Sequence, residues 1–588
     1  MLKYSTDDLD YFRLLKEIKK IDKLECSKQI RIAILSDCAT QQIASVLKVL
    51  FYKNEIHAEI YEGNFDSIEL EVFSPQSNLY AFDPDVVIIF NSTQKLKQIY
   101  YNYAADKSGL LESLQEKTVS IWEQLLQKKD FRIIQSSLVI PNESLFGNYD
   151  CKVDTSLYSI ATSLNHFLFQ KSQQYKTVFI NDVDRLASFH GRKNWLNDML
   201  WIHSKTPCSL EYIPYLCQNI VDIYLSSAGA AIKCVVLDLD NTLWGGVIGD
   251  DGLEGIALGH LGEGEAFFEI QQYFRELKHR GIILAVCSKN DYDNAIKPFR
   301  EHPEMCLKEE DITVFIANWN NKADNIREIK ETLNIGFDSL VFIDDSPYER
   351  NLVREFLPDV VVPDLPEDPA EYVRYISELN LFETSFFTQE DKSRADMYKV
   401  EFQRKNLAKS FTDINGYLQS LEMKITMNRF DEFNIPRIAQ LIQRSNQFNL
   451  TTKRYSESEC TAFMHDGKNC FPQYIKLEDK FGDYGLISVI ILKFVQQSLV
   501  IDSWLMSCRV LSRGVEQYAM NRIFDFAKNN NLGKVVGEYI PSPKNSMVED
   551  FYEKFGFSKQ SEQPDRVVWS LETDKYKPQQ VFLKEALQ

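Results

Sequence analysis

The 588-residue sequence lacks the features of a membrane or secreted protein. It has no run of about 18 apolar residues, the length that a membrane-spanning helix needs. Its first residues hold no apolar core followed by a small-residue cleavage site, so we expect no signal peptide. The 11 cysteines form no CxxC pair, which argues against zinc and for reduced thiols. We therefore expect a cytoplasmic protein without membrane insertion.

The chain also lacks an excess of positive charge. It has 66 basic and 85 acidic residues, a net charge of −19. A chain this acidic has no general attraction to nucleic acid or to anionic membranes. An acidic protein partner, such as a carrier protein, would have to meet a local basic patch.

The order of strand-like and helix-like segments predicts two parallel α/β domains. Up to about residue 228, apolar runs such as IRIAILSD and DVVIIFNST alternate with helical patterns such as QQIASVLKVLFYK. A second series begins at CVVLDLD and continues through IILAVCS, TVFIAN and SLVFIDD. Apolar strands that alternate with helices are typical of parallel sheets covered on both faces.

The predicted fold class is therefore multidomain α/β, with two three-layer α/β/α domains followed by an α+β domain. The last region combines strands such as YGLISVIIL with the helix EQYAMNRIFDFAKNN. The predicted parts are an N-terminal helix (1–28), two α/β domains (29–228 and 229–372), a helical connector (373–420) and the α+β domain (421–588).

Polar residues follow each predicted strand of the second α/β domain, in an order that suits phosphoryl transfer. They are Asp238, Asp240, Ser288, Lys322, Asp344 and Asp345. Asp238 could attack phosphorus and form an acyl phosphate, while Asp240 could protonate the leaving oxygen and later activate water. Ser288 and Lys322 could hold the phosphoryl oxygens as charge develops.

Several carboxylates around one phosphate would repel it, so the pattern also predicts a cation. Mg²⁺ would be bound by Asp238, the backbone carbonyl of Asp240, and Asp344 or Asp345. The segments between the motifs are shorter than about 50 residues, too short for a folded cap domain. We therefore expect an open site that admits large substrates. WGGVIGDDGLEGIAL, within the first of these segments, reads as hairpin-like.

These motifs, in this order, resemble the haloacid dehalogenase (HAD) superfamily. The stretches VVLDLDNTLWGGVIGDDG, AVCSKND and FIDDSPYER resemble, more narrowly, the FkbH-like family of HAD subfamily IIIC. The resemblance implies that a glyceryl unit from 1,3-bisphosphoglycerate is loaded onto an acyl carrier protein with loss of phosphate. It implies a role in polyketide-like or surface-polysaccharide biosynthesis, with a small phosphorylated acyl compound as substrate.

Cys287, next to Ser288, has two possible roles. A thiolate there, close to Lys289 and a cation, would have a lowered pKa. It could hold the acyl group as a thioester before transfer. A cysteine within a strand is more often a small buried apolar residue.

The first α/β domain resembles the SGNH hydrolase fold through ILSDCATQQ and FNST. Ser36 stands in place of the family's glycine and Cys38 in place of its nucleophilic serine, while Asn91 matches its asparagine. The family's closing DxxH is not met. The nearest candidates are Asp198 with the displaced His203, and His190. We expect a structural or docking domain without hydrolytic activity.

The last domain resembles the GNAT acyltransferases. The turn RVLSRG precedes a predicted helix, and backbone N–H groups at such a helix start bind pyrophosphate well. The resemblance implies a site for CoA or phosphopantetheine, with Tyr552 as a general acid. The expected binding residues are Arg509, Ser512, Arg513, Gly514 and Tyr552, and Cys508 is an alternative thiol.

NQFNLTTKRY (Asn446–Tyr455) looks like a surface segment whose Lys453 and Arg454 could meet an acidic carrier protein, although exposed basic pairs are usually only solvated. Two further functions stay open. The chain could be a simple phosphatase for a small phosphomonoester, or a non-catalytic assembly protein with vestigial sites.

Overall fold

The computed structural model describes residues 9–21, 26, 28–387, 414–480, 482–507 and 510–586. The chain divides into two compact units. One comprises Met1–Ser227 and Glu378–Phe386, and the other comprises Ala228–Ser377 and Phe387–Gln588. No helix in the described part of the chain has the length and apolar character to cross a membrane.

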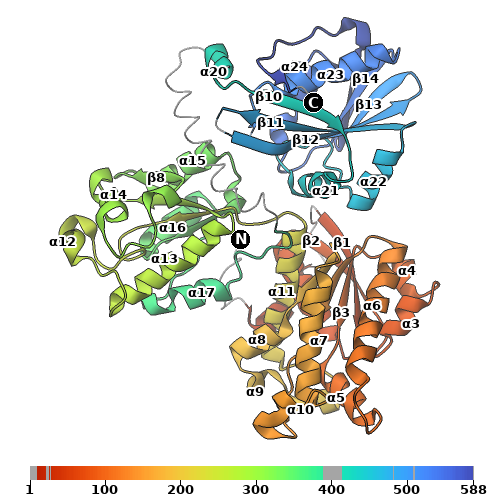
Figure 1. Ribbon diagram of the computed structural model, residues 1–588, viewed down its shortest axis with the longest axis vertical. Coiled ribbons are helices and arrows are strands. Elements are labelled where there is room, and N and C mark those ends of the chain that lie inside the picture. Colours follow the sequence, from red (N-terminus) through yellow and green to blue (C-terminus); the bar gives the residue numbers. More distant parts are fainter. Residues whose placement is uncertain are drawn as a thin grey trace. The chain divides into compact units, whose positions relative to one another are not determined.

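The N-terminal unit is a parallel sheet between two helical layers (Figure 1). Its strands lie in the order β2-β1-β3-β4-β5. They are β1 (Lys28–Ser36), β2 (Ile56–Glu62), β3 (Val86–Phe90), β4 (Arg132–Ser136) and β5 (Val178–Asn181). The helices are α1 (Tyr11–Ile21), α2 (Gln41–Lys53), α3 (Ile68–Phe73), α4 (Asn78–Phe82), α5 (Thr93–Asn102), α6 (Leu110–Lys128), α7 (Leu157–Ser172), α8 (Val183–His190), α9 (Arg192–Trp195), α10 (Asp198–Ser204) and α11 (Ile213–Ser227).

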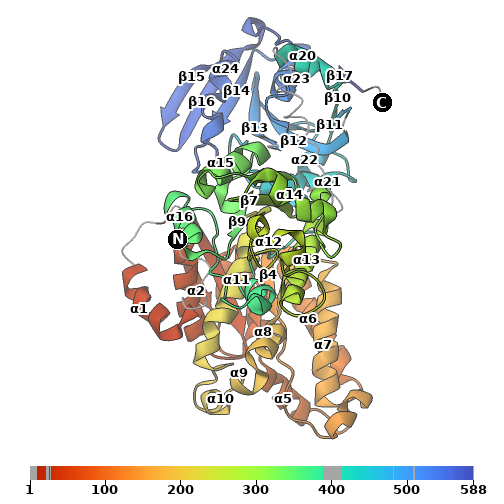
Figure 2. The same ribbon diagram turned by 90° about the vertical axis from the view of Figure 1, so that its left-hand side faces the viewer.

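Alternation along β1 explains the layers. Ile30, Ile32 and Ile34 pack in the core that includes α2 and α11, whereas Ala33 and Leu35 pack in the core that includes α3 and α6. Successive side chains of a strand point to opposite faces, so an almost wholly apolar strand must be covered on both. Figure 2 shows α1 beside α2 on the first of these faces.

The unit also includes a segment that returns from far along the chain. Asn380 Nδ2 donates hydrogen bonds to Asn219 Oδ1 and Asp222 Oδ2, each at 3.3 Å. The segment falls within the predicted connector (373–420), of which residues 388–413 lie outside the described residues. The exact division of the chain into domains stays a prediction.

The second unit contains a four-stranded parallel sheet in the order β8-β7-β6-β9. The strands are β6 (Cys234–Leu237), β7 (Ile283–Ser288), β8 (Val314–Ala317) and β9 (Leu340–Ile343). The helices are α12 (Ile248–Gly255), α13 (Glu263–His279), α14 (Tyr292–Glu301), α15 (Lys322–Leu333), α16 (Pro347–Phe356) and α17 (Tyr372–Glu378). Because all four strands are parallel, their carboxyl ends meet at one edge.

The stretch predicted as hairpin-like differs from that expectation. It holds the short helix α12, and one antiparallel bridge joins Gly245 to Ala257 around it. The sequence pattern of glycines and acidic residues indicated a turn-rich segment but not the helical turn within it.

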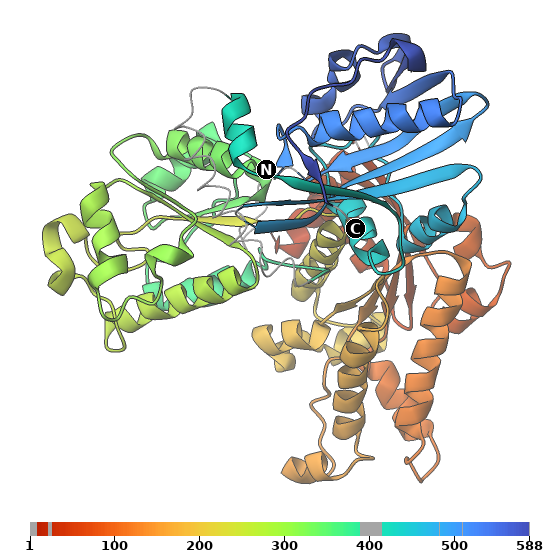
Figure 3. The same ribbon diagram turned by 45° about the horizontal axis from the view of Figure 1, so that its top comes forward.

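The second unit also contains an eight-stranded, mixed sheet in the order β15-β16-β14-β13-β12-β11-β10-β17. Its strands are β10 (Lys424–Arg429), β11 (Cys470–Asp479), β12 (Gly482–Val495), β13 (Ser498–Met506), β14 (Lys534–Tyr539), β15 (Ser558–Gln563), β16 (Arg566–Glu572) and β17 (Lys584–Glu585). The helices are α20 (Ile414–Ser420), α21 (Ile435–Arg444), α22 (Glu457–His465), α23 (Val515–Asn529) and α24 (Phe551–Lys554). Figure 3 shows α23, in blue, lying across these strands. The predicted multidomain α/β fold, with an α+β region at its C-terminal side, is confirmed.

Candidate active site

Asp238 follows β6 at the carboxyl edge of the four-stranded sheet. Its backbone N–H donates to the carbonyl of Ile343, the last residue of β9, at 2.9 Å. This bond fixes the end of the central strand to that of its neighbour. The chain then turns through Asn241, whose φ of 55° is left-handed and suits asparagine better than most residues. The Asp238 side chain is thereby held, almost fully buried, at the sheet edge.

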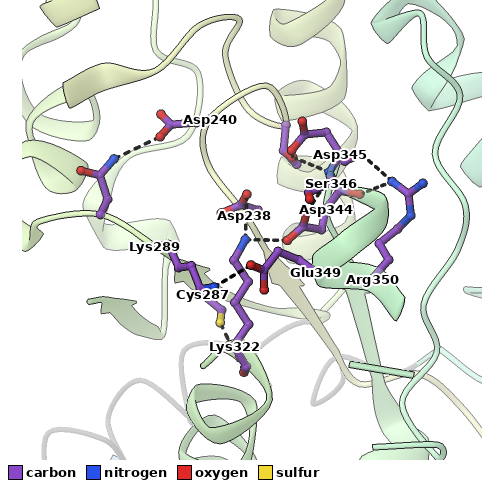
Figure 4. Close-up of polar contacts among 12 residues, drawn as sticks. Asp238, Asp240, Cys287, Lys289, Lys322, Asp344, Asp345, Ser346, Glu349 and Arg350 are labelled. Carbon is purple, nitrogen blue, oxygen red and sulfur yellow. Dashed lines mark hydrogen bonds and ion pairs between the residues drawn. The ribbon is translucent and has the colours of Figure 1, made fainter. Parts of the chain in front are cut away.

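Lys322, the first residue of α15, holds two of the carboxylates together (Figure 4). Its Nζ lies 2.9 Å from Asp238 Oδ2 and 2.5 Å from Asp344 Oδ2. Burial alone would lower the pKa of Lys322, but the two carboxylates outweigh it and the net shift is upward. The ammonium is therefore a fixed positive charge beside Asp238.

Asp344 and Asp345 follow β9, and the chain around them fixes both. The backbone N–H of Ser346 donates to Asp344 Oδ1 at 2.8 Å. Arg350 Nη1 donates to the carbonyls of Asp344 and Asp345 at 2.8 and 2.7 Å. Burial, and then the charge of Asp238, raises the pKa of Asp344 to about 7. Asp345 also has a raised pKa, chiefly through burial.

Three carboxylates converge on a position that suits a cation. One oxygen from each of Asp238, Asp344 and Asp345 lies within 4.8 Å of the other two. Asp238 Oδ1 is buried and has no hydrogen-bond partner among the described residues. A buried polar oxygen without a donor is costly, and a cation or a ligand would satisfy it. Carboxylate oxygens are the ligands that Mg²⁺ prefers, so the residues present fit the ion.

Asp240 points away from this group. Its Oδ1 accepts from Trp244 Nε1 at 2.9 Å and from the Ile248 N–H at 3.0 Å, and its Oδ2 accepts from Asn290 Nδ2 at 3.1 Å. Burial raises its pKa. A raised pKa makes it easier for a carboxyl group to hold and then donate a proton to a leaving oxygen. Its side chain is not part of the metal-binding group, and its backbone carbonyl as a metal ligand stays a prediction.

Ser288 ends β7 at the same edge and is almost fully buried. The strand register places Leu237 opposite Val286 on one side of β6 and opposite Ile343 on the other. The sequence order of the motifs therefore becomes a spatial cluster, because each motif follows a strand of one parallel sheet.

Comparison with known proteins identifies the family to which the chain belongs. The family model for the FkbH N-terminal domain matches residues 31–225. A crystal structure of the N-terminal part of the protein BF1531 from Bacteroides fragilis, containing a phosphatase domain complexed with Mg, is 40% identical, with a TM-score of 0.61. The match covers 64% of this chain and 100% of that one. The chain belongs to the FkbH-like family. No curated protein matches it.

Two acetyltransferase structures match about a quarter of this FkbH-like chain. The ribosomal-protein-S18-alanine N-acetyltransferase from Escherichia coli is 13% identical over 25% of this chain and 94% of that one, with a TM-score of 0.21. A spermidine N-acetyltransferase from Vibrio cholerae, in complex with CoA and spermine, is 16% identical over 26% and 98%, with a TM-score of 0.21. At these TM-scores neither likeness supports a conclusion about function.

Cys287 does not have the environment predicted for a reactive thiol. Its side chain faces the apolar core beneath α15 and α16 and is fully buried. Its Sγ lies 3.8 Å from the backbone carbonyl of Lys322. Burial raises the pKa of the thiol far above its usual range, and the nearby ammonium of Lys322 only partly opposes this. The predicted lowering of the pKa is wrong, because β7 turns Cys287 into the core.

Asn290 and Thr242 stand in the quoted motifs but were given no role, and Lys289 was expected only to act on Cys287. Asn290, two residues after Ser288, holds Asp240. Thr242 Oγ1 accepts from the Asp345 N–H at 3.2 Å. Lys289 Nζ donates to Glu349 Oε1 at 2.7 Å, so this lysine is paired with a carboxylate. In the sequence, these residues could have been recognised only by their position within three residues of a predicted site residue.

The SGNH-like residues of the N-terminal unit are only partly brought together. Cys38 Sγ lies 3.0 Å from Ser36 Oγ, and burial raises its pKa well above the usual range. His190 packs among tyrosine rings, and His203 on α10 is exposed. None of the hydrogen bonds of the described residues joins Cys38 to a histidine. The expectation of a domain without hydrolytic activity stays a prediction.

Of the expected CoA-binding residues, those that the structure describes contact other residues of the same domain. Cys508 and Arg509 lie outside the described residues. The Ser512 N–H donates to Glu516 Oε1 at 3.2 Å, and Gly514, with a φ of 82°, caps α23. Arg513 is buried against Tyr484. Tyr552 is fully buried, which raises its pKa and disfavours proton release.

The basic residues of Asn446–Tyr455 do not form the exposed surface that was predicted. Lys453 Nζ donates to Asp502 Oδ1 at 2.8 Å. Arg454 Nη1 donates to the Ser445 carbonyl at 2.9 Å, and burial lowers the pKa of its guanidinium to about 10. The segment is buried at its centre, so the surface prediction is wrong.

Proposed function

We propose that this FkbH-like protein is a Mg²⁺-dependent phosphatase of the HAD type, with Asp238 as its nucleophile. The proposal rests on the different surroundings of the two carboxylate oxygens of Asp238. Oδ2 is bound by Lys322 at 2.9 Å, whereas the buried Oδ1 has no partner in the described part of the chain. One oxygen is thus anchored and the other is free to form a bond.

The residues divide the reaction between them. Asp238 Oδ1 attacks phosphorus, the bond to the leaving oxygen breaks, and Asp240 gives that oxygen its proton. Asp240 then takes a proton from water, which attacks the aspartyl phosphate and releases inorganic phosphate. Lys322 offsets the negative charge that gathers at the phosphoryl group. The three carboxylates of Asp238, Asp344 and Asp345 would hold Mg²⁺, which supplies charge neutralisation and Lewis acidity when bound.

The substrate we propose is a small phosphorylated acyl compound. Family resemblance favours the glyceryl group of 1,3-bisphosphoglycerate, with an acyl carrier protein as acceptor in the cytoplasm. The thiol of the carrier would attack the acyl carbon, and phosphate would leave. The short segments between the site motifs, which leave no room for a cap domain, support a macromolecular acceptor.

A simple phosphatase for a small phosphomonoester is the second candidate. The burial of Cys287 favours it, because the enzyme then offers no thiol of its own at the site to carry an acyl group. This candidate needs only Asp238, Asp240, Lys322 and the metal.

Carrier-protein loading separates the two candidates. The phosphopantetheinylated carrier is mixed with the enzyme, Mg²⁺ and 1,3-bisphosphoglycerate, and its intact mass is followed together with phosphate release. We expect the carrier to gain one glyceryl mass with wild type, and to stop at the phosphoglyceryl mass with Asp238→Asn, which cannot remove the remaining phosphate. Phosphate release without a change in carrier mass would leave the simple phosphatase. Absence of both would contradict the proposed function.

A further inference from the structure

Two neighbouring strands of the C-terminal sheet diverge at their carboxyl ends. β13 and β14 are parallel and pair only from Ser498 opposite Lys534 to Ile501 opposite Gly537. β13 continues to Met506, so its later residues have no partner on β14. Two diverging strands present backbone N–H and C=O groups to an extended chain, such as the amide-bearing arm of CoA or phosphopantetheine.

In this protein the opening between the strands is filled by the chain itself. The Leu450 N–H donates to the Trp504 carbonyl of β13 at 3.1 Å, and the Leu450 carbonyl accepts from the N–H of Ile540, just after β14, at 2.9 Å. The Met506 N–H donates to the Phe448 carbonyl at 3.1 Å. Leu450 therefore bridges the two strands, and its side chain is 0% exposed.

Side chains hold this internal segment, Phe448–Thr451, in place. Asn545 Nδ2 donates to the Asn449 carbonyl at 2.8 Å, and Asn545 is itself 0% exposed. Thr451 Oγ1 donates to the Asp502 carbonyl of β13 at 3.1 Å. The Phe448 ring lies 5.3 Å from the ring of Phe551. These buried contacts make the segment part of the domain core.

The turn before α23 is also bonded to other groups of the protein itself. Glu516 is buried on the first turn of α23, and its Oε1 accepts from the Ser512 N–H. A pyrophosphate in this turn would compete for that N–H with a carboxylate that belongs to the protein. Arg513 Nη1 lies 3.6 Å from Asp479 Oδ2, so a carboxylate of the protein itself also balances the positive charge of Arg513.

The geometry points to a C-terminal domain that binds neither CoA nor phosphopantetheine between β13 and β14. Phe448–Thr451 takes the place of the extended arm, and the Glu516 carboxylate takes the place of the anion. The resemblance to acyltransferases then reflects fold without the cofactor. This inference does not depend on the proposed phosphatase function.

Hydrogen exchange of the full-length protein, read by mass spectrometry with and without CoA at about 1 mM, tests the inference. We expect slow exchange in peptides that cover 446–455 and 538–545, unchanged by CoA, and no CoA protection in peptides that cover 510–516. Faster exchange at 446–455 would show displacement of the segment and overturn the inference. New protection at 510–516 would also overturn it. Changes confined to 234–350 would place CoA at the phosphatase site and leave the inference standing.

A pair of variants tests the core role of the segment without relying on CoA. Asn545→Ala removes the buried donor to Asn449, whereas Asn530→Ala makes the same substitution at an exposed position after α23. We expect Asn545→Ala alone to speed exchange at 446–455 by at least about tenfold. Equal exchange in the two variants would overturn the assignment of the segment to the core. If Asn545→Ala does not fold, Asn545→Asp, which keeps the acceptor oxygen for the Ser542 N–H, replaces it.

Discussion

Lys322 binds one oxygen of Asp238 and leaves the other without a partner. The Nζ–Oδ2 distance is 2.9 Å, and Oδ1 is buried with no donor in the described part of the chain. A nucleophilic carboxylate needs this asymmetry, because both the orientation and the charge of the group are set before substrate arrives. The same ion pair fixes the end of β6 to the start of α15, so the fold and the chemistry depend on one contact.

Asp238→Asn should abolish phosphate release while leaving the fold intact. The carboxamide keeps the shape of the side chain but cannot attack phosphorus, so the rate should fall by about three orders of magnitude or more. Release of phosphate from p-nitrophenyl phosphate and the thermal midpoint measure the two effects. Asp293→Asn, the same change at an exposed position on α14, is the matched control. Turnover of Asp238→Asn near that of the control would exclude Asp238 as nucleophile.

Lys322→Met should destabilise the protein strongly in the absence of metal. The substitution leaves Asp238 and Asp344 buried without their counter-charge, which should cost about 3–5 kcal/mol. Thermal unfolding in EDTA measures the loss, and Lys330→Met on the same helix provides the control. Mg²⁺ should restore part of the loss by supplying positive charge. An unchanged thermal midpoint would mean that Lys322 is not essential to this charge balance.

Mg²⁺ should raise the thermal midpoint of the wild-type protein, and Asp345→Asn should weaken that effect. The ion binds the folded state only, because the three carboxylates converge only there. The readout does not require substrate. Asp364→Asn changes a more exposed carboxylate of the same domain and should leave the response intact. An equal Mg²⁺ response in both variants would remove Asp345 from the site.

Much of this site could be predicted because each motif follows an apolar strand. In a parallel sheet the carboxyl ends of strands share one edge, so Asp238, Ser288 and Asp344 could be placed together from the sequence. The helix over Gln41–Lys53 was also predicted with the bounds that the structure shows. Local apolar patterns carry this information.

Side-chain direction and long-range pairing could not be predicted in the same way. Cys287 and Ser288 are adjacent in β7, yet only the register of the strand decides that the thiol enters the core. Asn446–Tyr455 is polar enough to resemble a surface loop. Its burial depends on backbone bonds from Leu450 to Trp504 and to Ile540, which no local pattern encodes.

Asp37 should make the stability of the protein depend on pH. Burial raises its pKa from 3.8 to about 6, although Ser92 and Asn91 donate hydrogen bonds to it. The folded state then holds a proton that the unfolded state has lost, so the free energy of unfolding falls as pH rises from about 4 to about 6. The loss is about 3 kcal/mol above that range.

Asp37→Asn should remove this contribution. Relative to wild type, the variant should be more stable at about pH 7 than at about pH 4 by up to that amount. Scanning calorimetry of the full chain across this range measures the difference, with Asp154→Asn at an exposed position as control. A difference between Asp37→Asn and wild type that does not vary with pH would contradict the raised pKa.

Cys287 should be unreactive in the folded protein. Alkylation by iodoacetamide requires the thiolate, and the buried Cys287 has a strongly raised pKa, whereas Cys151 is exposed. Peptide mapping after brief labelling should therefore show modified Cys151 and unmodified Cys287. After unfolding in denaturant both should react at similar rates. Labelling of Cys287 at the rate of Cys151 in the native state would restore the thiol as a candidate nucleophile.

Cys287→Ala tests whether the thiol takes part in the reaction. Truncation of a fully buried side chain should cost about 1–2 kcal/mol of stability through the small cavity that it leaves. Phosphate release, and any loading of a carrier protein, should persist because Asp238, Asp240 and Lys322 are unchanged. Intact mass after exposure to 1,3-bisphosphoglycerate, with and without hydroxylamine, checks for a thioester on the enzyme. A hydroxylamine-sensitive adduct present on wild type and absent from Cys287→Ala would show that the thiol leaves the core during the reaction.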